Sequence, residues 1–165
     1  GKVILHHTCF NLKDVFQYLI NDVSGLLKKG QKIKYHHEGE EIVCLDSALL
    51  NNIILNLLSN AIKFSEEGKD IEFYSEIKNE QVTISIKDHG LGIPEEEQQH
   101  LMQRFYRAKN VSNIQGTGLG LHIVSKYVEL MGGSISFRSE ENKGTTFIIQ
   151  LTSKKTEDNE KDSID

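Results

Sequence analysis

The chain has 165 residues, a net charge of −5, 38% hydrophobic residues and 26% charged residues. These values fit one soluble globular domain and exclude a disordered chain, and the negative charge gives no electrostatic support for nucleic-acid binding. No apolar run approaches the roughly 20 residues that span a bilayer.

The cysteine count limits the kind of site and the compartment. Cys9 and Cys44 are too few for a disulfide framework or a zinc site. We therefore expect two ordinary, partly buried thiols and a reducing compartment, the cytoplasm.

Apolar periodicity and turn residues divide the chain into helices and strands. Asn11 has the position of a helix N-cap, and Asn79-Glu80 lies between two alternating segments, as in a hairpin. In chain order we expect a helix from Asn11 to about Leu27, strands at 32–37 and 41–45, a helix capped by Asp46 or Ser47 that runs to about Ser65, strands at 70–78 and 81–88, a short helix with Pro94 as its first residue, a helix from about Gly118 to Met131, and strands at 134–139 and 145–151.

This order predicts an α/β (α+β) two-layer sandwich, because the strands gather mostly on one side of several helices. The domain is expected to span residues 11–152. Residues 1–10 show no clear period and are expected to form a linker. The almost wholly polar segment 153–165 is expected to be a disordered tail, and the polar segment 107–117 a loop.

One face of the second long helix is a candidate site. Asn52, Asn56, Asn60 and Lys63 lie at i, i+4, i+8 and i+11 and share that face. Asparagine is a poor interior helix former, so three asparagines and a lysine on one stripe indicate a site. Amide oxygens and a lysine are what magnesium and phosphate need. The alternative is the solvated face of an amphipathic helix.

A second candidate is the segment Asp88-His89-Gly90-Leu91-Gly92-Ile93-Pro94, in which a strand leads into an acid and two glycines. Gly90 and Gly92 would let the backbone approach a ligand closely, and Asp88 could accept a hydrogen bond from an exocyclic amine. Glycine-rich turns are common, so a plain turn is the alternative.

A third candidate is the segment Gly116-Thr117-Gly118-Leu119-Gly120-Leu121, which leads straight into a helix. Glycines before a helix N-terminus form an anion nest, in which N–H groups and the helix dipole favour phosphate. A dinucleotide fingerprint should follow a strand in a βαβ unit. Because a polar loop precedes these glycines, a Rossmann site is disfavoured.

The order of these segments is more specific than any one of them. The stretches NLLSNAIKFS, DHGLGIP, QRFYRAKN and GTGLGLHIV resemble the N, G1, F and G2 boxes of the catalytic domains of two-component sensor histidine kinases, and GTTFIIQL resembles the family's last strand. The resemblance covers about residues 11–152. It implies the Bergerat ATP-binding fold of the GHKL superfamily, a mixed, mostly antiparallel sheet packed against helices, with ATP and Mg²⁺ as cofactors.

The resemblance also implies a role for each matching residue. Asn60 is similar to the magnesium ligand that links the metal to the phosphates, with Asn56 supporting the same pocket and Lys63 reaching a phosphate. Asp88 resembles the acid that reads the adenine amino group, with Thr145 as its water-mediated partner. The other implied contacts are Phe64 on the adenine or ribose, Gly90, Gly92 and Ile93 beside the base, Gly116, Thr117, Gly118, Leu119, Gly120 and Leu121 at the phosphates, and Arg107 and Lys109 from a mobile lid at 104–115. The implied catalytic residues are Asn56, Asn60, Lys63 and Arg107.

Asn56 indicates transfer rather than hydrolysis. Water-splitting members of the superfamily carry a glutamate general base at this position, and a neutral amide cannot take a proton from water. Phosphoryl transfer depends mostly on positioning and charge neutralisation. The resemblance therefore implies transfer of the ATP γ-phosphate to a histidine.

That histidine is not recognisable in this chain, because His6-His7-Thr8-Cys9 lacks the acceptor pattern. We expect it on a separate upstream dimerisation domain, in a homodimeric parent that passes the phosphate to a response regulator and could be a cell-membrane sensor. Three alternatives remain open: a serine kinase of the anti-sigma type, a gyrase-like ATPase, which Asn56 disfavours, and a nucleotide-sensing module without catalysis.

Overall fold

The computed structural model describes residues 4–100 and 119–154. Within them the elements follow in this order: β1 (His7–Asn11), α1 (Leu12–Val23), a 3₁₀ turn (Ser24–Leu26), β2 (Ile33–Gly39), β3 (Ile42–Asp46), α2 (Ser47–Phe64), β4 (Ile71–Lys78), β5 (Gln81–Lys87), α3 (Glu95–Gln98), α4 (Leu119–Leu130), β6 (Ser134–Glu140) and β7 (Gly144–Thr152).

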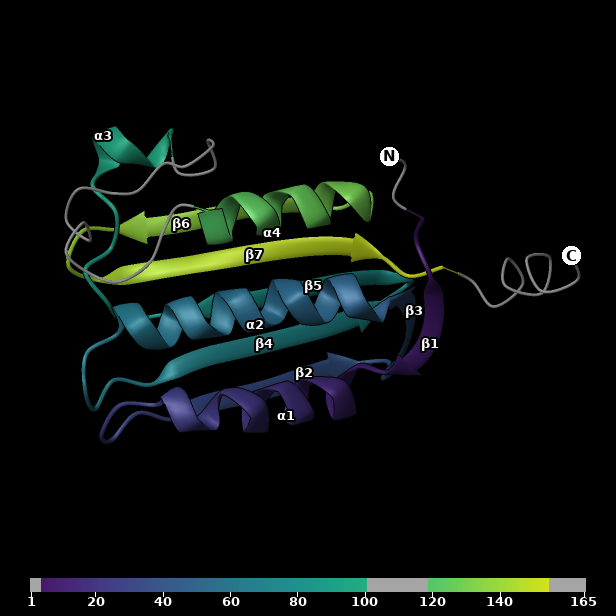
Figure 1. Ribbon diagram of the computed structural model, residues 1–165, viewed down its shortest axis with the longest axis horizontal. Coiled ribbons are helices and arrows are strands. Elements are labelled where there is room, and N and C mark those ends of the chain that lie inside the picture. Colours follow the sequence, from purple (N-terminus) through teal and green to yellow (C-terminus); the bar gives the residue numbers. More distant parts are fainter. Residues whose placement is uncertain (1–3, 101–118, 155–165) are drawn as a thin grey trace, which may run out of the picture.

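The main sheet has the strand order β2-β4-β5-β7-β6. β2 and β4 are parallel, and the other neighbours are antiparallel. α1, α2 and α4 lie side by side on one face of this sheet (Figure 1). The predicted two-layer sandwich with a mostly antiparallel sheet is therefore confirmed.

The core lies between these two layers. Phe16 of α1 and Phe73 of β4 are almost fully buried, with ring centroids 5.0 Å apart. Burying an aromatic side chain of this size contributes roughly 1.5–3 kcal/mol. One side of α2 adds seven buried apolar residues, namely Leu50, Ile53, Ile54, Leu57, Leu58, Ala61 and Ile62. This burial fixes which side of α2 is left for a site.

The predicted helix starts have capping side chains. The Asn11 side chain accepts a hydrogen bond from the Asp14 N–H at 3.0 Å. Asp46 Oδ1 accepts one from the Leu49 N–H at 3.0 Å, so Asp46 caps α2 and Ser47 is its first residue. Each such cap is worth about 1 kcal/mol.

Two predicted details differ from the structure. The first helix ends at Val23 and continues as a 3₁₀ turn, because Gly25 lowers helix propensity before the predicted end. Pro94 precedes α3 as its N-cap, with ψ 137°, and is not its first residue. The hairpin prediction is confirmed, since Asn79 and Glu80 have φ of 50° and 67° between β4 and β5, as a two-residue hairpin turn requires.

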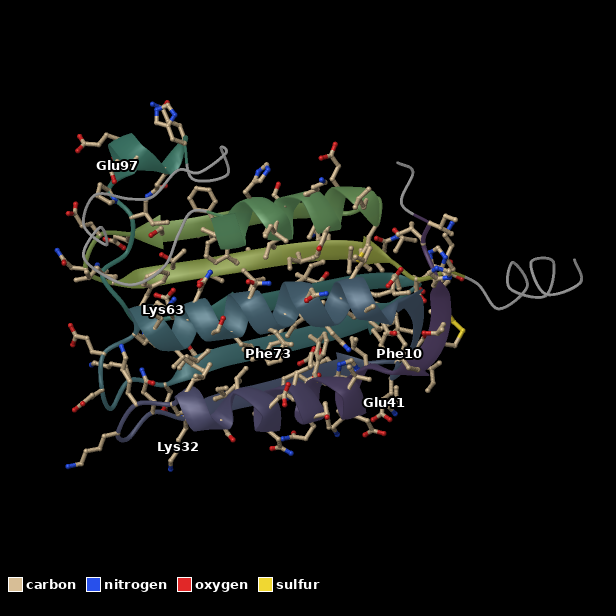
Figure 2. All side chains as sticks on the ribbon, viewed as in Figure 1. Phe10, Lys32, Glu41, Lys63, Phe73 and Glu97 are labelled. Atoms are coloured by element: carbon tan, nitrogen blue, oxygen red, sulfur yellow. A yellow bond between two sulfur atoms is a disulfide. The ribbon has the colours of Figure 1, made fainter. Side chains whose placement is uncertain are left out.

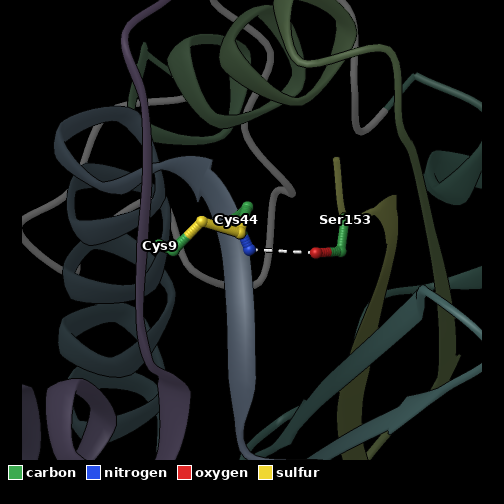
Figure 3. The surroundings of a disulfide bond; sticks show 3 residues. All are labelled: Cys9, Cys44 and Ser153. Atoms are coloured by element: carbon green, nitrogen blue, oxygen red, sulfur yellow. Dashed lines mark hydrogen bonds between the residues drawn. A yellow bond between two sulfur atoms is a disulfide. The ribbon is translucent and has the colours of Figure 1, made fainter. Parts of the chain in front are cut away.

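The prediction of two free thiols is wrong. β1 was not predicted, and it pairs antiparallel with β3 so that Cys9 lies opposite Cys44 with 4.0 Å between their Cα atoms. The two form a disulfide (Figure 3). Counting cysteines could not reveal this pair, because the pair depends on a strand register and not on spacing in the sequence.

The end of β7 is held beside the same strands. The Cys44 N–H donates to Ser153 Oγ at 2.9 Å (Figure 3). The Lys154 N–H donates to the Cys44 carbonyl at 3.0 Å. The rest of the segment predicted to be a disordered tail, 155–165, lies outside the described residues. The domain limits 1–10, 11–152 and 153–165 stay predictions.

Candidate functional site

The amide face of α2 lies against the first turn of α4. A Cβ atom added to Gly120 would be 3.6 Å from Asn56 Oδ1 and 3.9 Å from Asn60 Nδ2. The two helices pack against each other, with the end of α2 beside the start of α4 (Figure 1). Glycine at this position therefore brings the α4 backbone close to both amides, near the positive end of the helix dipole.

The three asparagines of this face are not equivalent. Asn52 is exposed, and its Nδ2 donates to the Ala48 carbonyl at 3.1 Å. Asn56 and Asn60 are half-buried, and Asn56 Nδ2 donates to the Asn52 carbonyl at 2.8 Å. Asn56 Oδ1 is thereby turned toward α4. No hydrogen bond joins the Asn60 side chain to another described residue, so this amide is available to a ligand.

Lys63 lies at the C-terminal end of α2 (Figure 2). Among the described residues, its ammonium group has no ion pair or hydrogen bond. Phe64, the last residue of the helix, is half-buried, and its carbonyl would be 2.1 Å from a Cβ atom at Gly90. The glycine turn after β5 therefore packs directly on the end of α2, which brings the second candidate segment to the first.

Asp88 lies in the wall of this site with 6% of its surface exposed. Its Oδ1 accepts hydrogen bonds from the Gly90 N–H at 3.0 Å and the Thr145 N–H at 3.1 Å. Burial raises the pKa of the carboxyl to about 6, opposed by those two N–H donors and by nearby His89. Its Oδ2 receives no hydrogen bond from the described residues. Asp88 can therefore offer this second oxygen to a ligand as an acceptor.

The glycines around Asp88 fit close contacts within the protein. A Cβ atom at Gly92, whose φ is +68°, would lie 2.1 Å from the Glu140 carbonyl oxygen. At Gly144, with φ +111°, it would lie 2.2 Å from the Asp88 carbonyl oxygen. These contacts within the protein explain Gly92 and Gly144 without a ligand. That Gly90 and Gly92 make room for a base stays a prediction.

Ile93 is the next residue of this turn after Gly92. It is 7% exposed and packs with half-buried Leu121, Phe137 and Phe147. The turn, α4, β6 and β7 therefore share one small apolar cluster. Leu119 is the first residue of α4. The other predicted phosphate contacts, Arg107, Lys109, Gly116, Thr117 and Gly118, and the predicted lid lie outside the described residues.

Several residues of this region were not predicted. The Lys28 ammonium donates to the Lys63 and Ser65 carbonyls, each at 2.7 Å, and Gln31 Nε2 donates to the Ser65 and Glu66 carbonyls, each at 3.1 Å. These side chains satisfy the free carbonyls at the end of α2. Their sequence neighbourhood carries no signal for this, because the partners lie more than 30 residues away.

Two further features bear on cofactor and membrane. Within residues 4–100 and 119–154, no three His, Cys, Asp or Glu side chains gather into a metal-binding group. Mg²⁺ keeps several waters and takes few protein oxygens when it binds with phosphates, so the half-buried amide oxygens of Asn56 and Asn60 suit it chemically. No helix in the described part of the chain is long and apolar enough to cross a membrane.

The chain also resembles known proteins. Residues 45–155 match the family described as histidine kinase-, DNA gyrase B-, and HSP90-like ATPase. The chain is 50% identical over 99 residues to the signal transduction histidine-protein kinase ArlS of Staphylococcus aureus (strain USA300), an alignment that covers 59% of this chain and 22% of that protein. The chain thus spans about a fifth of the length of this curated relative.

Solved structures with the same fold include two histidine kinases. The mycobacterial sensor histidine kinase MprB has a TM-score of 0.76 and 26% identity, covering 90% of this chain and 99% of that one. The nucleotide-free catalytic domain of the histidine kinase ThkA has a TM-score of 0.74 and 28% identity, covering 90% and 97%.

Proposed function

Because the chain belongs to the family of histidine kinase-, DNA gyrase B- and HSP90-like ATPases, we propose that it binds Mg·ATP and transfers the γ-phosphate to a histidine on a separate dimerisation domain. The observation that carries this proposal is the meeting of three features: the half-buried Asn56 and Asn60 amides, the first turn of α4 at Gly120, and the buried Asp88 carboxyl.

Asp88 would select the base. Its Oδ1 is occupied by two backbone N–H groups, so Oδ2 would accept a hydrogen bond from the adenine amino group. Hydrogen bonds to charged groups are worth about 1.5–3 kcal/mol. Thr145, which donates its N–H to Asp88, would complete the contact through water, and Phe64 would pack on the adenine or ribose.

The amide face of α2 would hold the phosphate end. Asn60, supported by Asn56, would supply a magnesium ligand, and Lys63 would reach a phosphate from the end of the helix. When bound, Mg²⁺ would neutralise charge on the phosphate oxygens. We assign the remaining phosphate contacts to Arg107, Lys109 and the glycines 116, 118 and 120.

The chemistry of α2 favours transfer over hydrolysis. The sequence of this helix, Ser47–Phe64, contains no aspartate or glutamate. A general base that activates water would therefore have to come from elsewhere. With the incoming histidine nitrogen as nucleophile, an N–P bond would form as the bond from the γ-phosphorus to the ADP oxygen breaks.

We infer the partners of this chain from the greater length of its relatives. Since this chain spans about a fifth of the kinase ArlS, we propose that its parent is a homodimer whose upstream helical domain carries the acceptor histidine and passes phosphate to a response regulator. We place the catalytic domain in the cytoplasm, where ATP is available, and the parent at the cell membrane.

A phosphotransfer assay tests this function. The domain is incubated with γ-labelled ATP, alone and with the histidine-acceptor domain of its parent. Alone it should turn over slowly and remain unlabelled, and in the mixture the acceptor should gain a label that is lost in acid and kept in base. Brisk hydrolysis by the domain alone would indicate an ATPase, and an acid-stable label on another protein would indicate a serine kinase.

A further inference from the structure

The hydroxyl of Ser139, in β6, contacts three groups close to Asp88. They are the Ile93 N–H, the Gly144 carbonyl and the Thr145 hydroxyl. We propose that Ser139 is a positioning residue that turns the Thr145 hydroxyl into a hydrogen-bond acceptor, and thereby favours 6-aminopurine over 6-oxopurine nucleotides. This inference rests on the proposed function and concerns the base that the same site selects.

The contacts of Ser139 are short and come from different elements. Its Oγ accepts the Ile93 N–H at 2.7 Å, lies 2.8 Å from Thr145 Oγ1, and donates to the Gly144 carbonyl at 3.2 Å. Ser139 and Thr145 are direct partners in the antiparallel pairing of β6 and β7. Strand register therefore fixes the two hydroxyls face to face.

Only one placement of the two hydroxyl hydrogens makes all three contacts at once. A carbonyl can only accept, so the Ser139 hydrogen must point to Gly144, and Thr145 must then donate its hydrogen to Ser139 Oγ. In this arrangement Ser139 accepts two hydrogen bonds and donates one. Because its one hydrogen is already donated, Thr145 Oγ1 can only accept a hydrogen bond from any further partner.

The consequence reaches Asp88, because the Thr145 N–H is bonded to Asp88 Oδ1 at 3.1 Å. Asp88 Oδ2 and Thr145 Oγ1 are then both acceptors in one part of the site. A 6-amino group, or a water that donates, satisfies them. A 6-oxo group brings another acceptor, and a site built to pair with a donor rejects an analogue that lacks it.

The surrounding frame does not depend on the Ser139 hydroxyl alone. Gln98 Nε2 donates to the Ile93 carbonyl at 2.9 Å and to the Ser139 carbonyl at 3.0 Å. The Asn142 N–H donates to the Leu91 carbonyl. The glycine turn is therefore tied to β6 by other bonds. Removing the hydroxyl takes its acceptor from the Ile93 N–H and its partner from Thr145, while these other bonds keep the turn in place.

The test is the ratio of affinities for ADP and inosine diphosphate, measured by calorimetry with Mg²⁺. The unsubstituted domain should prefer ADP. Ser139→Ala frees the Thr145 hydrogen to donate to the 6-oxo group, so the preference should fall about 5- to 10-fold, the value of one ordinary hydrogen bond. Ser139→Thr, which keeps a hydroxyl and suits a strand, should retain the preference.

The controls separate positioning from folding and from the proposed function. If Ser139 had a purely structural role, Ser139→Ala would weaken the binding of both nucleotides equally. An unchanged ratio of the two affinities, in a variant whose melting temperature is also unchanged, would overturn the inference. In a Thr145→Val background, Ser139→Ala should no longer alter the ratio, and an undiminished change there would also overturn it. If the unsubstituted domain binds neither nucleotide, both the proposed function and this inference are wrong.

Discussion

At the scale of single residues, we expect the Asp88 carboxyl to make nucleotide binding depend on pH. Burial raises its pKa from 3.8 to about 6, and protonation would remove the charged acceptor. We therefore predict that ADP affinity falls as pH drops from 7.5 to 5, by about tenfold per pH unit below the pKa. Calorimetry over this range, with Asp88→Asn as the matched control for titration of the nucleotide itself, should show a larger fall in the unsubstituted domain than in the control. An equal fall in both would contradict the assignment.

The raised pKa of Asp88 also affects the stability of the unliganded domain, in the opposite direction to nucleotide binding. Because the native pKa lies above the ordinary value, the folded protein binds the Asp88 proton more tightly than the unfolded chain does. The contribution of Asp88 to stability is therefore greatest below pH 4 and is lost as pH rises through 6. Binding and stability should thus respond to Asp88 in opposite directions.

Asn60 and Asn52 offer a matched pair on one helix face. Asn60 is half-buried opposite Gly120, whereas Asn52 is exposed. We predict that Asn60→Ala weakens binding of Mg·ATP about tenfold or more, the loss of one strong polar contact, and leaves adenosine binding nearly unchanged. Asn52→Ala should alter neither. Equal effects of the two substitutions would mean that the stripe is only a solvated helix face.

At the scale of elements, Lys28 and Gln31 close the end of α2. The Lys28 ammonium contacts the Lys63 and Ser65 carbonyls, where a cation also suits the helix dipole. Lys28→Met keeps the side-chain length and should lower the free energy of unfolding by about 1–3 kcal/mol, with weaker nucleotide binding because Lys63 loses its support. Lys29→Met, at an exposed neighbour, is the control. Indistinguishable denaturation curves would rule out this role for Lys28.

The disulfide makes β1 responsive to reductant. It closes a loop between cysteines 35 residues apart, a length for which cross-linking contributes about 3–4 kcal/mol in the chain-entropy account. A dithiol breaks this cross-link, so adding it should destabilise the domain by that amount. It should have no effect on a Cys9→Ser, Cys44→Ser double variant. Alkylation of both cysteines before any reduction would contradict the bond.

Local signals were enough for much of the fold. The caps at Asn11 and Asp46 act within three residues of sequence, so the sequence predicts them. The strand His7–Asn11 has only five residues, and its pairing with β3 is non-local. The contacts of Lys28 and Ser139 likewise depend on which elements meet in space. The same reason explains why the ordered motifs predict candidate site residues but not the side chains that support them.

At the scale of the whole molecule, one sheet supports three helices, and the site lies where α2, α4 and the glycine turn meet (Figure 1). The fold and family inferred from the ordered motifs are confirmed. The implied lid at 104–115 and its cations are outside the described residues. The described elements already contain the acid and the amide face to which we assign the base and the phosphates, so we predict that the domain binds nucleotide without a partner.

A calorimetric titration with Mg·ADP measures whether the isolated domain binds nucleotide by itself. We predict saturable binding at one site per chain, weakened roughly 10- to 100-fold by Asp88→Asn through loss of one hydrogen bond to a charged group. The absence of saturable heat up to millimolar nucleotide, or an affinity that Asp88→Asn leaves unchanged, would contradict it.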